Sequence, residues 1–134
     1  MAIYGIGAKY DTTDISAIFL KENFVATGWD DFDAPDLHEY FKVINPGDIV
    51  YIKSCSYSSD ITVKGVGIVT NDELLTSKRH SRIEIGRNVK WIYKNWFVID
   101  RPSEGKNNVR ANTIYREFHP DIIAEIMRVY NRYA

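Results

Sequence analysis

Apolar residues near the start of the chain alternate between strand-like runs and helical spacing. Ala2–Gly7 and Phe24–Gly28 are short, mainly apolar runs, which are typical of strands. Thr12 or Thr13 is suited to cap a helix between them, and Asn23 is suited to end it. The expected helix has an acidic first turn and an apolar stripe, formed by Asp14 and by Ile15, Ile18 and Phe19.

The middle of the chain predicts a second helix and two strands. Pro35 is suited to open a helix with the apolar residues Leu37, Tyr40 and Phe41. The turn Asn45–Asp48 then leads into a strand at Ile49–Lys53. The next strand, Ile61–Val69, has apolar residues on both faces, so we expect it to be central in a sheet. Two glycines on one of its faces predict a bend or a close backbone approach: Gly65 and Gly67.

The last third of the chain predicts a loop, a strand and a terminal helix. Asn71–Asn88 is polar and basic, as loops are, whereas Lys90–Ile99 is rich in aromatic and β-branched residues. Trp91 and Trp96 point to opposite faces of that strand, and the simplest expectation places both in the core. Pro120 opens a helix with an apolar stripe of Ile122, Ile123, Ile126, Met127 and Tyr130.

This order of elements predicts an α+β fold, in which a small, strongly bent mixed β-sheet or barrel is flanked by helices. The 134 residues fit one domain, residues 1–134, and the hydrophobic share of 45% is enough for a globular core. One cysteine excludes an intrachain disulfide and suits a reducing cytoplasm. The chain has no apolar run that would span a membrane and no signal-like start, so we expect a cytoplasmic protein without membrane contact.

The charges are unevenly distributed along the sequence. Between Asp11 and Asp48 there are nine acidic residues and two lysines, whereas between Lys78 and Arg116 there are ten basic and three acidic residues. A basic face for phosphates is one interpretation of this pattern, and local cancellation in the fold is the other. The candidate phosphate-binding residues are Lys78, Arg79, Arg82 and Arg110.

Three stretches together resemble the PUA-like superfamily, and within it the EVE and YTH-type domains. They are a strand that ends in a tryptophan (Phe24–Trp29), the turn and strand "PGDIVYIKS", and the glycine-valine-glycine stretch "VKGVGIVT" followed by "VKWIYKNWFVI". The resemblance extends through most of the chain to about Ile99. It implies a small bent barrel that recognises nucleic acid, often by holding a modified base between aromatic rings. Stacking of a base on such a ring contributes about 1–3 kcal/mol.

Carried across by position, the resemblance makes Trp29 one wall of the base pocket and the segment from Lys53 to Tyr57 its polar rim, with Tyr57 as a possible second wall. The end of the first strand would close the floor. The ligand-binding residues implied in this way are Lys9, Tyr10, Trp29, Lys53, Ser54, Ser56 and Tyr57. A different interpretation of Trp29 is that it plugs the core at one end of the barrel.

The sequence lacks the common signatures of catalysis, so we expect neither an enzyme nor a cofactor. Cys55 lies between two serines, but its neighbourhood in the sequence has no histidine that would activate it as a nucleophile. No phosphate-loop, dinucleotide or zinc signature is present. The hydroxyl-rich loop around Cys55 is better suited to hydrogen-bond a polar ligand.

The leading hypothesis is a non-enzymatic module that binds a nucleobase-containing ligand, with a modified base in DNA or RNA preferred. The acidic stretch Asp30–Asp33 would repel a phosphate backbone. A second hypothesis is therefore a protein that binds and sequesters a free or cyclic signalling nucleotide. A third is a protein–protein adaptor that uses the acidic surface Asp30–Glu39. The oligomeric state stays open.

Overall fold

A computed structural model describes residues 1–10, 12–54, 60–102 and 112–134 of the chain. Within these ranges a seven-stranded mixed sheet has the order β4-β7-β6-β5-β1-β9, and β8 pairs with β6 beside this path. The pair β1 and β5 is parallel, and the other pairs are antiparallel. The strands are β1 (Ile3–Gly7), β4 (Phe24–Thr27), β5 (Ile49–Ser54), β6 (Ile61–Val69), β7 (Ile85–Tyr93), β8 (Phe97–Ile99) and β9 (Ile114–Arg116).

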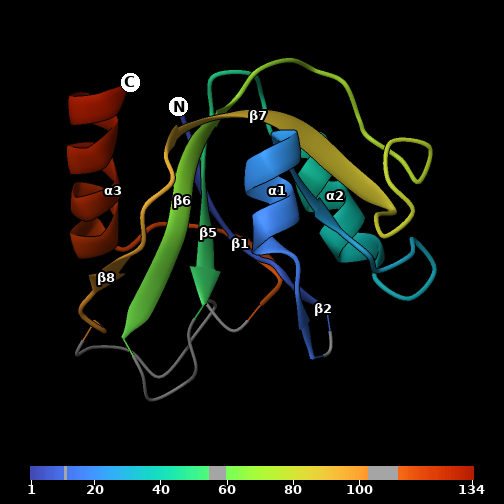
Figure 1. Cartoon of the computed structure of the whole chain (residues 1–134), viewed down its shortest axis with the longest axis horizontal. Coiled ribbons are helices and arrows are strands. Elements are labelled where there is room, and N and C mark those ends of the chain that lie inside the picture. Colours follow the sequence, from blue (N-terminus) through green and yellow to red (C-terminus); the bar gives the residue numbers. More distant parts are fainter. Residues whose placement is uncertain (11, 55–59, 103–111) are drawn as a thin grey trace.

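Helices cover the sheet on two sides. In Figure 1, α1 (Ser16–Glu22) and α2 (Pro35–Val43) lie on the opposite side of the strands from α3 (Pro120–Tyr133). Two buried clusters correspond to these sides. One contains Phe19 of α1 and Phe41 of α2, and the other contains Ile122 and Ile126 of α3. The predicted α+β fold, a small and strongly bent mixed sheet flanked by helices, is confirmed.

The bend of the sheet is concentrated where β6 crosses its neighbours. The pairing of β6 with β7 shifts register between Val66 and Gly67, and β7 arches over the end of β6 in Figure 1. A Cβ atom on Gly67 would lie 2.4 Å from Val89 Cγ1, so only glycine fits there. β6 also pairs with β5 and β8, which makes it a central strand. Both predictions for Ile61–Val69 are confirmed.

The sequence prediction was wrong about the start of the first helix. Thr12 and Thr13 do not cap α1, because Thr13–Asp14 forms a short strand, β3, that pairs with β2 (Lys9–Tyr10). The helix begins at Ser16, whose backbone N–H donates to the Asp14 carboxylate at 2.8 Å. Asn23 ends the helix in the left-handed conformation, with φ at 61°, as expected from its small polar side chain.

The predicted strand Lys90–Ile99 is two strands. β7 begins earlier, at Ile85, because Ile85–Asn88 pairs with β4, so the predicted loop Asn71–Asn88 ends too late. The chain then turns between Tyr93 and Phe97, which places Trp96 outside the core. Trp91 is 8% exposed but Trp96 is 64% exposed, so the expectation that both are buried was wrong for Trp96. The short strand β9 was not predicted at all.

Among the residues that the structure describes, no helix is both long and apolar enough to cross a membrane.

Candidate ligand-binding site

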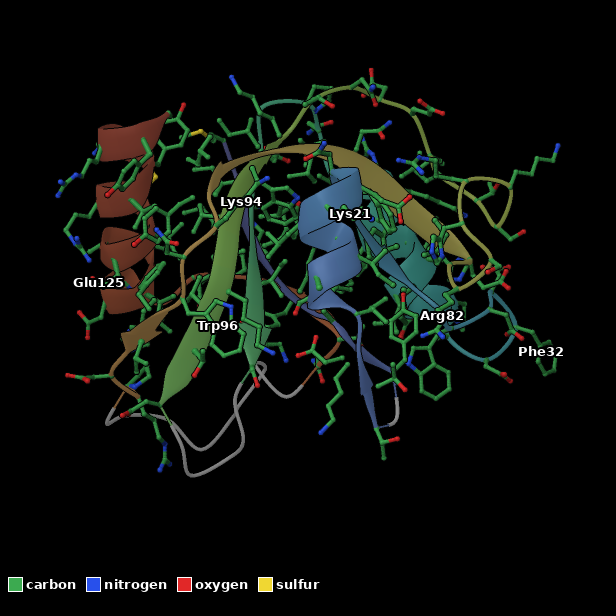
Figure 2. The ribbon with its side chains drawn as sticks, viewed as in Figure 1. Lys21, Phe32, Arg82, Lys94, Trp96 and Glu125 are labelled. Atoms are coloured by element: carbon green, nitrogen blue, oxygen red, sulfur yellow. The ribbon has the colours of Figure 1, made fainter. Side chains whose placement is uncertain are left out.

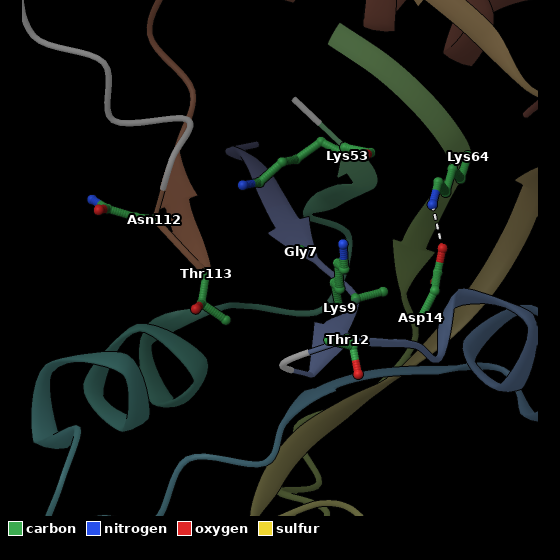
Figure 3. Close-up of a pocket in the computed structure, with 10 residues that line it drawn as sticks. Gly7, Lys9, Thr12, Asp14, Lys53, Lys64, Asn112 and Thr113 are labelled. Atoms are coloured by element: carbon green, nitrogen blue, oxygen red, sulfur yellow. Dashed lines mark hydrogen bonds and ion pairs between the residues drawn. The ribbon is translucent and has the colours of Figure 1, made fainter. Parts of the chain in front are cut away.

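The carboxyl ends of the two parallel strands open into a cavity of about 470 Å³. Gly7 at the end of β1 is paired with Lys53 near the end of β5. The β2–β3 hairpin closes one side of the cavity, and the residues just before β9 close another (Figure 3). The described residues that line it are Gly7, Ala8, Lys9, Thr12, Asp14, Lys53, Ser54, Lys64, Asn112 and Thr113. We call it the lysine cavity.

Among the described residues, three lysine side chains line the lysine cavity: Lys9, Lys53 and Lys64. Lys53 is only 8% exposed, and its ammonium nitrogen lies 5.7 Å from the centre of the Tyr115 ring, a distance that permits a cation–π attraction. Lys64 forms an ion pair with Asp14 and also lies over the Trp96 ring, at 5.0 Å. Lys9 is exposed at the rim. The described lining of the cavity thus contains three lysines and one carboxylate, that of Asp14.

Asp14 is held ionised by its contacts. Burial raises the pKa of its carboxyl, but hydrogen bonds from Lys64 and from Ser16 outweigh burial and bring the pKa below the ordinary value. The resulting ion pair of Lys64 and Asp14 fixes the β3 end of the hairpin against β6 (Figure 3).

Trp29 lies in a second cavity, of about 560 Å³, that shares a wall with the lysine cavity. Trp29 is 54% exposed, so it is not a plug of the core. The shared wall is formed by Asn112 and Thr113, which line both cavities. The remaining lining comes from the acidic loop, from α2 and from β9: Asp33, Ala34, Pro35, Asp36, Leu37, Tyr40 and Ile114. We call it the tryptophan cavity.

The backbone around Trp29 is held by hydrogen bonds. His38 of α2 is buried and donates from Nε2 to the Trp29 carbonyl at 2.6 Å. The Trp29 N–H donates to the Thr27 hydroxyl at 3.2 Å. These bonds fix the position of the Trp29 backbone at the end of β4 while its ring stays exposed. A ring presented in this way needs little rearrangement to stack on a ligand.

Tyr10 does not line either cavity, although the resemblance implied that it would contact the ligand. Its ring packs over Gly28, where a Cβ atom would lie 2.9 Å from Tyr10 Cε2. The hydroxyl is buried without a partner among the described residues, and burial raises the pKa of Tyr10 far above its ordinary value. Tyr10 therefore supports the core beneath the Trp29 loop.

The basic segment expected to bind phosphates lies away from both cavities. Arg79 donates to the side chain and to the backbone carbonyl of Glu22, at 3.2 and 3.0 Å, and so fastens its loop to the end of α1. Lys78 and Arg82 are exposed but line neither cavity. Figure 2 shows Arg82 at the side of the molecule where Phe32 projects, away from Trp96.

Several predicted site residues lie outside the described residues: Cys55, Ser56, Tyr57 and Arg110. Of the others, the structure gathers Lys9, Lys53 and Ser54 in the lysine cavity and places Trp29 next to it. The sequence analysis missed Lys64 and gave Asp14 only a place in the first turn of a helix. The available signal was Lys64 itself, the one charged residue of the mainly apolar central strand Ile61–Val69.

The described residues contain no group of three or more histidine, cysteine or acidic side chains that could hold a metal ion. A scan against models of protein families finds none that matches this chain. A search of curated proteins likewise finds no match.

Proposed function

We propose that this chain is a non-enzymatic PUA-like module that binds a nucleobase-containing ligand, with a modified base in DNA or RNA as the preferred target. The observation that carries the proposal is the exposed Trp29 ring in a cavity that shares the Asn112–Thr113 wall with the lysine cavity. An aromatic surface beside a hollow whose described lining contains lysine, hydroxyl and amide groups is compatible with the two parts of a nucleotide, a flat base and a polar sugar-phosphate.

The tryptophan cavity is suited to a base. Trp29 offers a stacking face, and Tyr40, 38% exposed, lies at the same cavity. Asp33 and Asp36 are acceptors for the amino groups of a base edge, while Asn112 both donates and accepts. Hydrogen bonds to the base edge are how a base outside a helix is distinguished from the others.

Binding rather than catalysis is proposed because, among the described residues, the lining of the lysine cavity offers hydrogen-bonding groups but no histidine that could activate a nucleophile. Its described hydroxyl and amide groups are those of Thr12, Ser54, Thr113 and Asn112, and no histidine lines it. Groups of this kind hold a polar ligand by several adaptable hydrogen bonds.

A free or cyclic nucleotide is the second candidate, and two observations favour it. Asp33 and Asp36 line the same cavity as Trp29, and they would repel the phosphates that flank a base in a polymer. In addition, Arg79 of the basic segment is engaged with Glu22. A small ligand needs only the two adjoining cavities.

A fluorescence titration tests the proposal. A Trp96→Phe background removes the other exposed indole, so quenching on ligand addition reports Trp29. We expect nucleosides, mononucleotides or short modified oligonucleotides to quench this emission and to raise the melting temperature. A ligand at 100 times its Kd adds about 2.7 kcal/mol to the free energy of unfolding. Flat titrations with every nucleotide would overturn the proposal and favour a protein partner at the acidic surface.

Salt dependence separates the two candidates. A polymer bound through several phosphates releases counterions, so its affinity falls steeply as salt is added. A mononucleotide that stacks on Trp29 and contacts few charges should lose affinity much more gradually. The same fluorescence signal, measured at several salt concentrations with a mononucleotide and with an oligonucleotide, decides between them.

A further inference from the structure

We propose that the tryptophan cavity selects a base that carries a positive charge, namely a purine or pyrimidine methylated on a ring nitrogen. This assignment rests on the proposed function, in which a base stacks on Trp29, and it adds the kind of base. The groups that would recognise the charge are the exposed Trp29 ring and the carboxylates of Asp33 and Asp36, which line the same cavity.

Four aspartates follow the exposed tryptophan within seven positions of the chain, and they fall into two pairs. Asp30 accepts the backbone N–H of Asp33 at 2.7 Å, and the carboxylate of Asp31 lies 3.8 Å from Nδ1 of His38. The first pair, Asp30 and Asp31, therefore holds the loop. The second pair, Asp33 and Asp36, is exposed and lines the cavity, so its carboxylates can accept hydrogen bonds from a ligand.

Carboxylates at a stacking site do not favour an ordinary nucleotide. A neutral base has no net charge for Asp33 and Asp36 to attract, and they repel the phosphate that accompanies it. Methylation of a ring nitrogen reverses this preference, because the base then carries a positive charge that is spread over the ring stacked on Trp29. The same two carboxylates attract such a base directly.

Tryptophan is the aromatic side chain best suited to a cation. The face of its indole ring is electron-rich and attracts a positive charge within about 6 Å of the ring centre, most strongly where water is excluded. Trp29 is 54% exposed, and Tyr40 supplies a second ring at the same cavity. Stacking and charge attraction therefore act on the same ring of the ligand.

The rest of the described lining suits a flat ring with a methyl group. Pro35, Leu37 and Ile114 contribute apolar side chains, while Asn112 and Thr113 contribute polar groups for the base edge or the sugar. A methylated base has apolar faces and a delocalised charge, so it is weakly hydrated and enters such a cavity readily. A compact ammonium group, as in lysine, is hydrated more strongly and is less suited to it.

Isomeric methylated nucleosides test the charge directly. The compounds 1-methyladenosine and 3-methylcytidine are cations at neutral pH, and they have neutral isomers, N6-methyladenosine and 5-methylcytidine, that carry the methyl group elsewhere. In the Trp96→Phe background we expect each cation to quench Trp29 with about tenfold higher affinity than its neutral isomer. Raising the pH until 1-methyladenosine loses its charge should remove this advantage, while the affinity for N6-methyladenosine stays the same.

Variants of the two aspartates identify the groups that recognise the charge. Asp33→Asn and Asp36→Asn should each weaken the binding of 1-methyladenosine by about threefold to tenfold, and that of N6-methyladenosine much less. Glu39→Gln is the matched control, because it removes a negative charge from the same helix as Asp36 but from a residue that pairs with Lys42 and is not part of the described lining. An equal loss in Glu39→Gln would overturn the role of the two carboxylates.

The possible outcomes distinguish failure of the charge selectivity from failure of the proposed function. Neutral isomers that bind as tightly as the cations would overturn the selectivity but leave base binding at Trp29 standing. Titrations in which no nucleoside quenches Trp29 would overturn both. Tetramethylammonium is a further probe, because it resembles the head group of a methylated lysine in a protein. If it binds as tightly as 1-methyladenosine, the cavity recognises a cation without a base, and the assignment to a methylated base is wrong.

Discussion

The hydroxyl groups of Tyr51 and Tyr115 lie 2.7 Å apart across the strand that separates them. Tyr51 on β5 and Tyr115 on β9 both pair with Gly5 of β1, so the two rings meet over a residue without a side chain. Tyr51 also donates to the Glu117 carboxylate at 2.7 Å, and the second oxygen of Glu117 accepts from the backbone N–H groups of Phe118 and His119. This buried network joins β5 and β9, across β1, to the start of α3.

Gly5→Ala should therefore destabilise the protein. A Cβ atom on Gly5 would lie 2.4 Å from both Cζ and Oη of Tyr115, inside a packed layer that has no room to give. Overpacking of this kind costs about 1–3 kcal/mol. Urea denaturation measures the loss as a lower midpoint. Gly7→Ala, two residues further along the same strand, is the matched control, because its Cβ atom would make only ordinary contacts. An equal loss in both variants would contradict the steric explanation.

Tyr51→Phe should cost about 1.5–3 kcal/mol, the usual contribution of a hydrogen bond to a charged group. The variant keeps the ring but leaves the buried Glu117 carboxylate without one of its donors. Tyr40→Phe removes the same atom from a half-exposed side chain and should change stability very little. Thermal or urea unfolding of the two variants compares them directly. If Tyr51→Phe is as stable as the wild type, the network does not stabilise the fold.

The same tyrosine predicts a loss of stability in alkali. Burial raises the pKa of Tyr51 well above its ordinary value of 10.0, and the nearby Tyr115 and Glu117 raise it further. Above pH 10 the unfolded chain releases this proton while the folded protein keeps it, so the free energy of unfolding falls as pH rises. The slope is about 1.4 kcal/mol per pH unit for one such group. Unfolding curves above pH 10 should show a shallower decline for Tyr51→Phe, and an unchanged slope would contradict the assignment.

Arg87 provides a further test of the fold. Its guanidinium group is 1% exposed and donates to the carbonyls of Phe41 and Ile44 at the end of α2, and to the carbonyl of Asn71 at 2.8 Å. Arg87→Leu leaves these carbonyls unpaired and should cost about 3 kcal/mol or more. Arg82→Leu, on an exposed side chain, should stay within about 0.5 kcal/mol of the wild type. Denaturation midpoints of the two variants give the comparison.

The parts of the fold that the sequence predicted are those in which local pattern and tertiary packing agree. The strand Ile61–Val69 and the helix from Pro120 carry strong periodic signals, and both form as expected. The sequence analysis missed the strands whose formation depends on pairing with segments that are distant in the sequence. Ile85–Asn88 forms a strand because it pairs with β4. Ile114–Arg116 forms a strand because it pairs with β1 at the edge of the sheet. Neither segment has a pattern of its own that indicates this pairing.

The candidate site was predictable in its residue types but not in its arrangement. Lys53 and Trp29 were chosen by resemblance, and the structure places them in adjoining cavities. The role of Arg79 could not be predicted, because its partner Glu22 is 57 residues away in the sequence. The same holds for the ion pair of Lys64 and Asp14, which are 50 residues apart. A count of charges along the chain cannot tell a residue that is already paired from one that faces a cavity.

Trp29 and Trp91 form a matched pair for the last prediction, because the same substitution should have opposite effects at the two positions. Trp91 is 8% exposed, packs in the core and donates from its indole nitrogen to the Phe19 carbonyl at 2.8 Å. Trp91→Ala should therefore cost about 3–5 kcal/mol of folding stability. Trp29 is 54% exposed and is held by its backbone, so Trp29→Ala should leave the denaturation midpoint nearly unchanged.

The effect on binding should be reversed. Trp29→Ala should remove about 1–3 kcal/mol of nucleotide affinity, the usual contribution of one base–aromatic stack. Trp91→Ala should bind normally in its folded fraction, because its ring faces the core. Titrations at a temperature where both variants are folded, combined with urea denaturation, separate the two effects. A Trp29→Ala protein that is strongly destabilised but still binds normally when folded would show that Trp29 serves the fold and not the ligand.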